Sequence, residues 1–234
     1  MLRRWFVVAL VLSLAGVPLL AQDAKKKKAP NPAYQQIEDV PGLPRVLILG
    51  DSISIGYTLA VREELKGKAN VHRPATNCGP TTNGVKNIDA WLGAGKWDVI
   101  HFNFGLHDLK YIDDKGQLVE PAKGKPQVSL DDYQKNLETI VARLKKTGAK
   151  LIFCTTTPVP EGSNGRIKGD ELQYNKVAQV VMKNHGVAID DLYAFALPKL
   201  AEIQLPKNVH FTAEGSKVLA KQVASSIAEA LEKK

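Results

Sequence analysis

Two residues near opposite ends of the chain have the chemistry of a nucleophile and a base. Ser52 follows an apolar run in the segment "RVLILGDSISIG", and His210 stands in "VHFTAEG". A serine hydroxyl is a poor nucleophile until a base takes its proton, and an imidazole has the near-neutral pKa that suits this task. Position alone also allows a structural role, in which each residue caps the helix that follows it.

Polar residues also follow two other apolar runs. The loop "NCGPTTNG" comes soon after "NVHRPA" and offers backbone amides at Gly79 and Thr82. His107 and Asp108 come directly after "WDVIHFNFGL". Fixed N–H donors of this kind stabilise the negative oxygen that forms when a carbonyl group is attacked.

The elements that must position these residues alternate between strand and helix patterns. Segments with helical periodicity separate five short apolar runs, at 45–50, 70–75, 97–105, 149–157 and 187–191. Continuous apolar runs are typical of strands that are covered on both faces, which favours a parallel sheet. Right-handed β-α-β crossovers then predict an α/β fold, a three-layer α/β/α sandwich with a five-stranded, mainly parallel sheet. Ligands bind such sheets beyond the carboxyl ends of the strands.

Helix boundaries are also visible. Ser129 and Asp132 form a capping-box pattern before "YQKNLETIVARLKKTG", and Gly148 offers a stop. Another periodic segment lies between Gly169 and Gly186, and "TAEGSKVLAKQVASSIAEALEKK" predicts the last helix.

In this order the blocks resemble those of the SGNH hydrolases, also called the GDSL family of esterases and lipases. That family is defined by a Ser in Gly-Asp-Ser, a Gly in the loop after the second strand, an Asn in Gly-x-Asn-Asp and a His in Asp-x-x-His. Here "GDS" at 50–52 matches the first block and "VHFTAEG" resembles the last, so the resemblance spans about residues 44–230. It implies the flavodoxin-like fold of that family and a metal-independent acyl hydrolase that needs no cofactor.

The resemblance also implies roles for individual residues. It makes Ser52 and His210 the catalytic pair. It forms the oxyanion hole from the amide of Ser52, a backbone amide near Gly79 or Thr82, and the side chain of His107.

His107 departs from the family pattern, which has an asparagine there, while Gly105 and Asp108 stay in place. A ring N–H can replace the amide as a donor. We hypothesise that His107 completes the oxyanion hole and turns the site toward a bulkier or anionic substrate. Asp51 and Asp108 are candidate orienting or supporting residues.

Lys207 is the second departure, because it stands three residues before His210, where the family has an acid. A cation cannot orient an imidazolium as a carboxylate does, and close by it would lower the pKa of the histidine. Three arrangements stay open: Asn208 or a backbone carbonyl accepts the ring N–H, an acid such as Asp190 or Asp191 serves, or the site is crippled. A Ser-His dyad is workable, since the orienting acid supplies only part of the acceleration.

The N-terminus has the features of an export signal. Two arginines precede an uncharged apolar stretch, and Ala21 offers a cleavage site, which predicts a signal peptide over 1–21. An uncleaved membrane anchor is the alternative. The Lys- and Pro-rich segment 22–43 is then expected to be a solvated tether, and 44–234 the hydrolase-like domain. The protein would work in the periplasm or outside the cell.

The net charge of +8 does not indicate a nucleic-acid partner. The two arginines of the leader and the four lysines at 25–28 account for six of these charges, so the domain is nearly neutral. Contact with a membrane is expected only through an uncleaved N-terminal segment. Cys78 lies in a loop and Cys154 in an apolar run, and we expect two unpaired thiols.

We therefore expect an exported serine esterase that removes a short acyl group, such as acetyl, from a small-molecule or carbohydrate ester. Arg166, in a segment after the fourth strand, is a candidate rim residue for an anionic substrate group. Three alternatives stay open: an inactive protein that binds a glycan, an acyltransferase that uses the same serine, and a metal-dependent hydrolase built on His107, Asp108 and His210. The sequence has no compact ligand motif such as H-E-x-x-H, which weighs against the last.

Overall fold

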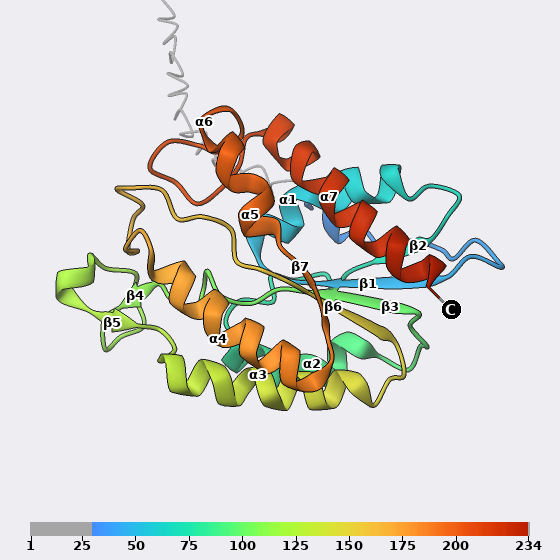
Figure 1. The fold of residues 1–234 in the computed structure, drawn as a ribbon, viewed down its shortest axis with the longest axis horizontal. Helices are drawn as coiled ribbons and strands as arrows, with labels where there is room; N and C mark the ends of the chain where they lie inside the picture. The colour runs from blue at the N-terminus through green and yellow to red at the C-terminus, as the bar shows by residue number, and fades with distance from the viewer. Residues whose placement is uncertain (1–29, 234) are drawn as a thin grey trace, which may run out of the picture. The chain divides into compact units, whose positions relative to one another are not determined.

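A parallel sheet of five strands forms the centre of the fold (Figure 1). The computed structural model describes residues 30–233, so the predicted signal peptide and the first part of the tether lie outside the described residues. The strands are arranged in the order β2 (Asn70–His72), β1 (Arg45–Leu49), β3 (Val99–Phe102), β6 (Lys150–Cys154) and β7 (Ala188–Asp190). All neighbouring strands pair in parallel, as the continuous apolar runs predicted.

Helices cover both faces of this sheet, which confirms the predicted three-layer sandwich. One face carries α1 (Ser52–Glu64), α5 (Leu192–Ala196), α6 (Leu200–Ile203) and α7 (Ala213–Glu232). The other face carries α2 (Thr81–Leu92), α3 (Leu130–Lys145) and α4 (Asp170–His185). Within 30–233, no helix has both the length and the apolar character that a membrane span requires. Because α1 packs along α7, the two ends of the domain are neighbours in space.

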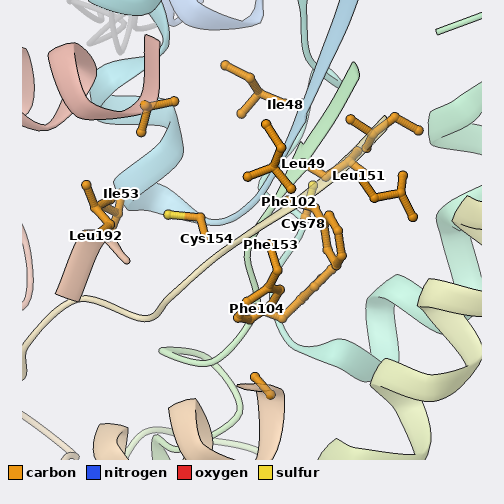
Figure 2. Close-up of a cluster of buried hydrophobic side chains, with 14 of the residues drawn as sticks. Ile48, Leu49, Ile53, Cys78, Phe102, Phe104, Leu151, Phe153, Cys154 and Leu192 are labelled. Atoms are coloured by element: carbon orange, nitrogen blue, oxygen red, sulfur yellow. The ribbon is translucent and has the colours of Figure 1, made fainter. Parts of the chain in front are cut away.

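The three central strands, β1, β3 and β6, bury side chains on both faces, which explains why their sequences do not alternate. Residues 46–49 of β1 are all buried. Phe102 of β3 and Phe153 of β6 pack edge to face with ring centroids 5.4 Å apart, in the cluster that Figure 2 shows with Ile48 and Leu49. Burying one such side chain stabilises the fold by about 1.5–3 kcal/mol. The core contains many of them, so its packing holds the strands, and with them the ends of the strands, in place.

A second sheet of two antiparallel strands lies between β3 and α3 in the chain. It pairs β4 (Tyr111–Ile112) with β5 (Lys125–Pro126). The sequence did not predict it, because strands of two residues are too short to show an alternation.

The capping box predicted for α3 is present at its N-terminus. Ser129 is the N-cap of α3, and its hydroxyl accepts from the Asp132 amide at 3.2 Å.

Part of the expected tether is folded onto the domain. A turn of 3-10 helix, η1 (Pro32–Tyr34), packs against α1 with Ala33 buried. The Asn70 side chain accepts from the amide of Val40 at 2.9 Å and donates to its carbonyl at 3.1 Å. Residues 31–43 therefore make specific contacts with α1 and β2, although most of them are exposed to solvent, and the expected domain start at residue 44 stays a prediction.

Both cysteines are buried and neither forms a disulfide, which confirms the expectation of two unpaired thiols. Burial raises the pKa of the Cys78 thiol to about 11, although a backbone hydrogen bond with Gly50 opposes this rise. Cys78 is therefore a neutral core residue at physiological pH.

The segment between α6 and α7 is tied back on itself. The Leu205 amide donates to the His210 carbonyl at 3.0 Å, and the Thr212 amide donates to the Ile203 carbonyl at 2.9 Å. Thr212 is also the N-cap of α7, where its hydroxyl accepts from the Gly215 amide at 2.9 Å. These bonds fix residue 210 relative to the first turn of α7.

Gly215→Ala is expected to disturb this connection. A Cβ at position 215 would lie 2.0 Å from the carbonyl oxygen of Ile203, so backbone must move. We expect a loss of about 1–3 kcal/mol in the free energy of unfolding, measured by urea denaturation. Gly56→Ala is the matched control: in α1 the nearest atom to the added Cβ is Ser216 Oγ at 3.2 Å, which can rotate, and alanine favours a helix. Equal stability of the two variants would contradict the prediction.

Candidate active site

The first strand ends in the turn that carries Ser52. Asp51 is the N-cap of α1, because its side-chain oxygen accepts from the Ile53 amide at 2.9 Å. Ser52 is the first residue of the helix, so the alternative in which Ser52 caps α1 is wrong. Asp51, predicted as a supporting residue, therefore caps the helix in place of Ser52. The Ser52 hydroxyl is half-buried at the positive end of the helix and can bond to another group.

His210 reaches Ser52 from the segment before α7. Its Nε2 lies 2.9 Å from Ser52 Oγ, although 158 residues separate the two in the sequence. Its Nδ1 lies 2.8 Å from Oδ1 of Asn208, an oxygen that also accepts from the His210 amide at 3.0 Å. Because an amide oxygen only accepts, Nδ1 carries the hydrogen and Nε2 presents its lone pair to the serine hydroxyl. A general base needs this tautomer.

Lys207, at the position of the family's acid, lies against the loop after β6. Its backbone is left-handed, with a φ of 54°. A Cβ built on Gly162 would lie 3.3 Å from Cγ of Lys207, so the lysine side chain runs along this glycine. The turn brings Asn208 to the imidazole, which is the first of the three arrangements that the sequence left open.

The two aspartates that were candidates for the missing acid have other partners. Asp190 Oδ2 lies 3.0 Å from Nε2 of His101. Asp191 is the N-cap of α5, and its Oδ1 accepts from the Thr155 hydroxyl at 3.0 Å. Both carboxylates therefore stabilise the fold around β7 and α5.

The loop before α2 contacts the turn that carries Ser52, since the Cys78 amide donates to the Gly50 carbonyl at 3.2 Å. Gly79 has a φ of 65°, and its amide donates to Oδ1 of Asn77 at 2.9 Å. Thr82 is the second residue of α2, where an amide has no acceptor within the helix. Of the two predicted backbone donors, the Gly79 amide is held by Asn77 and the Thr82 amide lies in the open first turn of α2.

Asp108 joins the turn after β3 to the start of α2. Its Oδ1 accepts from the Thr81 amide at 2.8 Å and from the Thr81 hydroxyl at 2.5 Å. Its Oδ2 is buried and has no hydrogen-bond partner among the described residues. Burial raises the pKa of Asp108 to about 7, and the bonds from Thr81 oppose that rise only in part. Asp108 is therefore a buried brace between two of the loops that carry predicted donors.

His107 is half-buried beside this brace. Burial lowers its pKa; the negative charge of Asp51 opposes that effect, and the positive charges of Lys110 and Arg166 reinforce it. The ring is therefore neutral at pH 7 and carries one N–H donor. Such a donor can stabilise an oxyanion without carrying a charge of its own.

Arg166 holds the turn that carries His107. Its Nε and Nη2 donate to the carbonyl oxygen of Leu106 at 3.1 and 3.0 Å, and its Nη1 donates to that of Asn164 at 3.3 Å. Three of its five N–H donors thus have backbone acceptors, and a contact with a substrate anion at this rim stays a prediction.

One group of potential metal ligands occurs within 30–233, and all its members are buried. The ligand atoms of His101, Cys154 and Asp190 lie within 4.8 Å of one another. Burial raises the pKa of the Cys154 thiol well above its usual value. Asp190 already pairs with His101 and accepts from Gln222 at 2.9 Å. We interpret this group as a hydrogen-bonded part of the core.

The comparison with known protein families shows which family the chain belongs to. The model of the GDSL-like Lipase/Acylhydrolase family matches residues 48–218. Because this match covers well over half of the sequence, the chain belongs to that family. None of the curated proteins matches the sequence significantly.

Several solved structures have a similar fold. An acetyl xylan esterase, AlAXEase, has 17% identity and a TM-score of 0.64, over 78% of this chain and 99% of that chain. A lipase/acylhydrolase from Enterococcus faecalis has 20% identity and a TM-score of 0.65, over 80% and 96%. Axe2, an acetylxylan esterase from Geobacillus stearothermophilus, has 19% identity and a TM-score of 0.64, over 79% and 94%. At these identities the likeness shows the fold.

Sequence reasoning missed two polar residues next to the site. Thr81 donates twice to Asp108, and Arg73 is buried with hydrogen bonds to Gly50 and Ser54. Arg73 carried a signal, because a charge directly after a predicted strand either ends in solvent or requires buried partners. Thr81 carried less, since a threonine at a helix start is common.

The raised pKa of Asp108 predicts a stability that depends on pH. The folded protein binds this proton more tightly than the unfolded chain, so stability falls as pH rises from the ordinary value of 3.8 toward about 7. Asp108→Asn keeps an acceptor for Thr81 without a charge. We expect it to flatten the decline in unfolding free energy between pH 5 and pH 8 by about 1 kcal/mol or more, in urea titrations.

Asp114→Asn is the control for this experiment, because the Asp114 side chain is 98% exposed. It should leave the pH dependence unchanged. A wild-type slope in the Asp108 variant would show that the buried carboxyl does not titrate in this range.

Proposed function

We propose that the protein is a serine esterase in which Ser52 attacks the acyl carbon and His210 is the general base. One observation carries the proposal: Asn208 Oδ1, the His210 ring and Ser52 Oγ form a continuous chain of contacts of 2.8 and 2.9 Å. Membership of the GDSL-like lipase/acylhydrolase family supports an ester bond as the target.

In the first half of the proposed reaction, the acyl group moves to the serine. Nε2 of His210 takes the hydroxyl proton while Ser52 Oγ bonds to the carbonyl carbon, and the carbonyl electron pair moves onto oxygen. Asn208 holds the ring as it becomes an imidazolium. The imidazolium then protonates the leaving alcohol, and the carbon–oxygen bond to that alcohol breaks. Water repeats the sequence in the second half and releases the acid.

In this proposal three donors stabilise the negative oxygen. They are the Ser52 amide in the first turn of α1, the Thr82 amide in the first turn of α2, and the neutral ring of His107. Two helix N-termini add their positive dipole ends. A fourth donor, the Gly79 amide, becomes available when the oxyanion replaces the Asn77 oxygen as its acceptor. Loss of a single donor of this kind costs roughly 100- to 1000-fold in rate.

We further propose a short-chain acyl ester of a carbohydrate, such as an acetylated polysaccharide, as the substrate. Two of the structural neighbours are described as acetyl xylan esterases. The signal-like N-terminus supports export to the periplasm or the cell exterior, where such polymers occur. A sugar hydroxyl in place of water would make the same site an acyltransferase, and analysis of the products distinguishes the two.

Ser52→Ala tests the proposed nucleophile. On residues 22–234 we expect the wild type to hydrolyse p-nitrophenyl acetate and acetylated xylan, and to react with a fluorophosphonate probe. The variant should lose about 1000-fold or more in rate, together with the labelling. Ser225→Ala, an exposed serine on α7, should keep both. Labelling of the Ser52 variant would disprove the assignment, and a wild type without labelling or hydrolysis would favour the glycan-binding alternative.

Asn208→Asp tests how His210 is oriented. A carboxylate stabilises the imidazolium formed in the transition state better than an amide does, so kcat/KM for p-nitrophenyl acetate should rise several-fold. Asn208→Ala should lower kcat/KM by about 10-fold or more. Lys207→Ala, whose side chain lies against Gly162, is the control and should have no effect. Equal rates in the two Asn208 variants would rule out the orienting role.

A further inference from the structure

Arg73 lies directly after β2, and its side chain is among the largest that the domain buries completely. Its Nη1 donates to Thr58 Oγ1 at 2.9 Å and to Ser54 Oγ at 3.2 Å. Both acceptors belong to α1, the helix that begins with the nucleophile. The guanidinium therefore packs behind the first turns of this helix.

The same guanidinium also bonds to the two loops next to the nucleophile. Its Nη2 donates to the carbonyl of Thr76 at 3.2 Å and to that of Gly50 at 3.4 Å, and its Nε donates to that of Pro74 at 3.3 Å. Gly50 precedes Asp51 and Ser52, and the other two carbonyls belong to the loop that leads to Gly79. Arg73 thus connects the nucleophile turn with the loop before α2.

All five of these acceptors are neutral oxygens. Among the residues that the structure describes, no carboxylate oxygen lies within 4.0 Å of the Arg73 guanidinium. Its other close partner is the ring of Tyr34, 5.5 Å from the guanidinium carbon. The hydrogen bonds are satisfied, but no carboxylate forms an ion pair with the charge. Burial lowers the pKa of Arg73, and the negative charge of Asp51, the N-cap of α1, opposes this effect from beyond ion-pair distance. A buried charge of this kind is expensive, and apolar residues often stabilise a fold better.

We propose that Arg73 is a positioning residue that holds the nucleophile turn and the loop before α2 together, and that its unpaired charge favours the negative oxygen formed between them. This inference rests on the proposed esterase function. Gly50 supports it, because its carbonyl oxygen accepts from both Arg73 Nη2 and the Cys78 amide, so one atom links the two segments. In a buried site a fixed positive charge acts with little screening by water.

Arg73→Met, Arg73→Gln and Arg73→Lys separate the charge from the packing. On p-nitrophenyl acetate we expect Arg73→Met and Arg73→Gln to lower kcat by about 10- to 100-fold with KM changed less than about 3-fold, because the loss falls on the transition state. Arg73→Lys should recover part of kcat, since it keeps the charge. Arg45→Met is the control: Arg45 stacks over Trp97 at the start of β1, at the other end of the strand, and this variant should keep kcat.

Hydrogen exchange provides a readout that does not depend on catalysis. In Arg73→Gln, amides in 50–54 and 76–84 should exchange faster, while those of α4 should not change. Wild-type kcat in Arg73→Gln would overturn the proposal, even if its melting temperature falls. A kcat in Arg73→Lys as low as in Arg73→Gln would overturn the role of the charge. If Arg73→Met does not fold, the Lys and Gln variants decide.

The failure of the esterase function gives a different result. In that case the wild type neither hydrolyses esters nor reacts with the fluorophosphonate probe. The positioning role is then judged by exchange alone: faster exchange in 50–54 and 76–84 supports it, and unchanged exchange overturns it.

Discussion

The contact between Ser52 Oγ and His210 Nε2 depends on the packing of α1 along α7. A hydrogen bond contributes only about 0.5–1.5 kcal/mol to stability, which is small beside the entropy of joining residues that lie 158 positions apart. The free energy comes instead from the apolar core around the sheet, part of which Figure 2 shows. Once the core has formed, the start of α1 and the segment before α7 are adjacent, and the bond follows at little further cost.

A neutral amide at the position next to the imidazole gives this site its particular character. Asn208 fixes the ring tautomer by accepting a hydrogen bond from Nδ1, as a carboxylate does. The same oxygen also accepts a hydrogen bond from the His210 amide. An amide stabilises an imidazolium less than a carboxylate does, because an amide dipole interacts with a positive charge more weakly than a full negative charge does. The left-handed backbone at Lys207 explains why Asn208 contacts the imidazole although the family's acid stands at position 207. The turn directs the Asn208 side chain to the ring, and the Lys207 side chain lies against the loop after β6.

Buried polar groups hold the surrounding loops. Asp108 ties the turn after β3 to α2, and Arg166 holds that turn through the Leu106 carbonyl. Arg73 connects the turn that carries Ser52 with the loop before α2. Each group is partly or fully removed from water, which is costly for a charge. What the fold gains is a set of loops whose N–H groups cannot easily reorient, and fixed donors of this kind are effective for a negative oxygen.

The sequence by itself determined the five strands, the cap of α3, and the serine and histidine that meet, because these follow from local periodicity and from motif order. Local patterns could not choose between Asn208 and a distant acid such as Asp190, since that choice depends on a backbone turn and on which groups the other carboxylates already bind. The tertiary structure alone also decided that Asp51 rather than Ser52 caps α1, that residues 31–43 pack on the domain, and that the charge of Arg73 is buried without a carboxylate beside it. Each of these is a competition between partners that are far apart in sequence, and only the folded chain brings them within reach of one another.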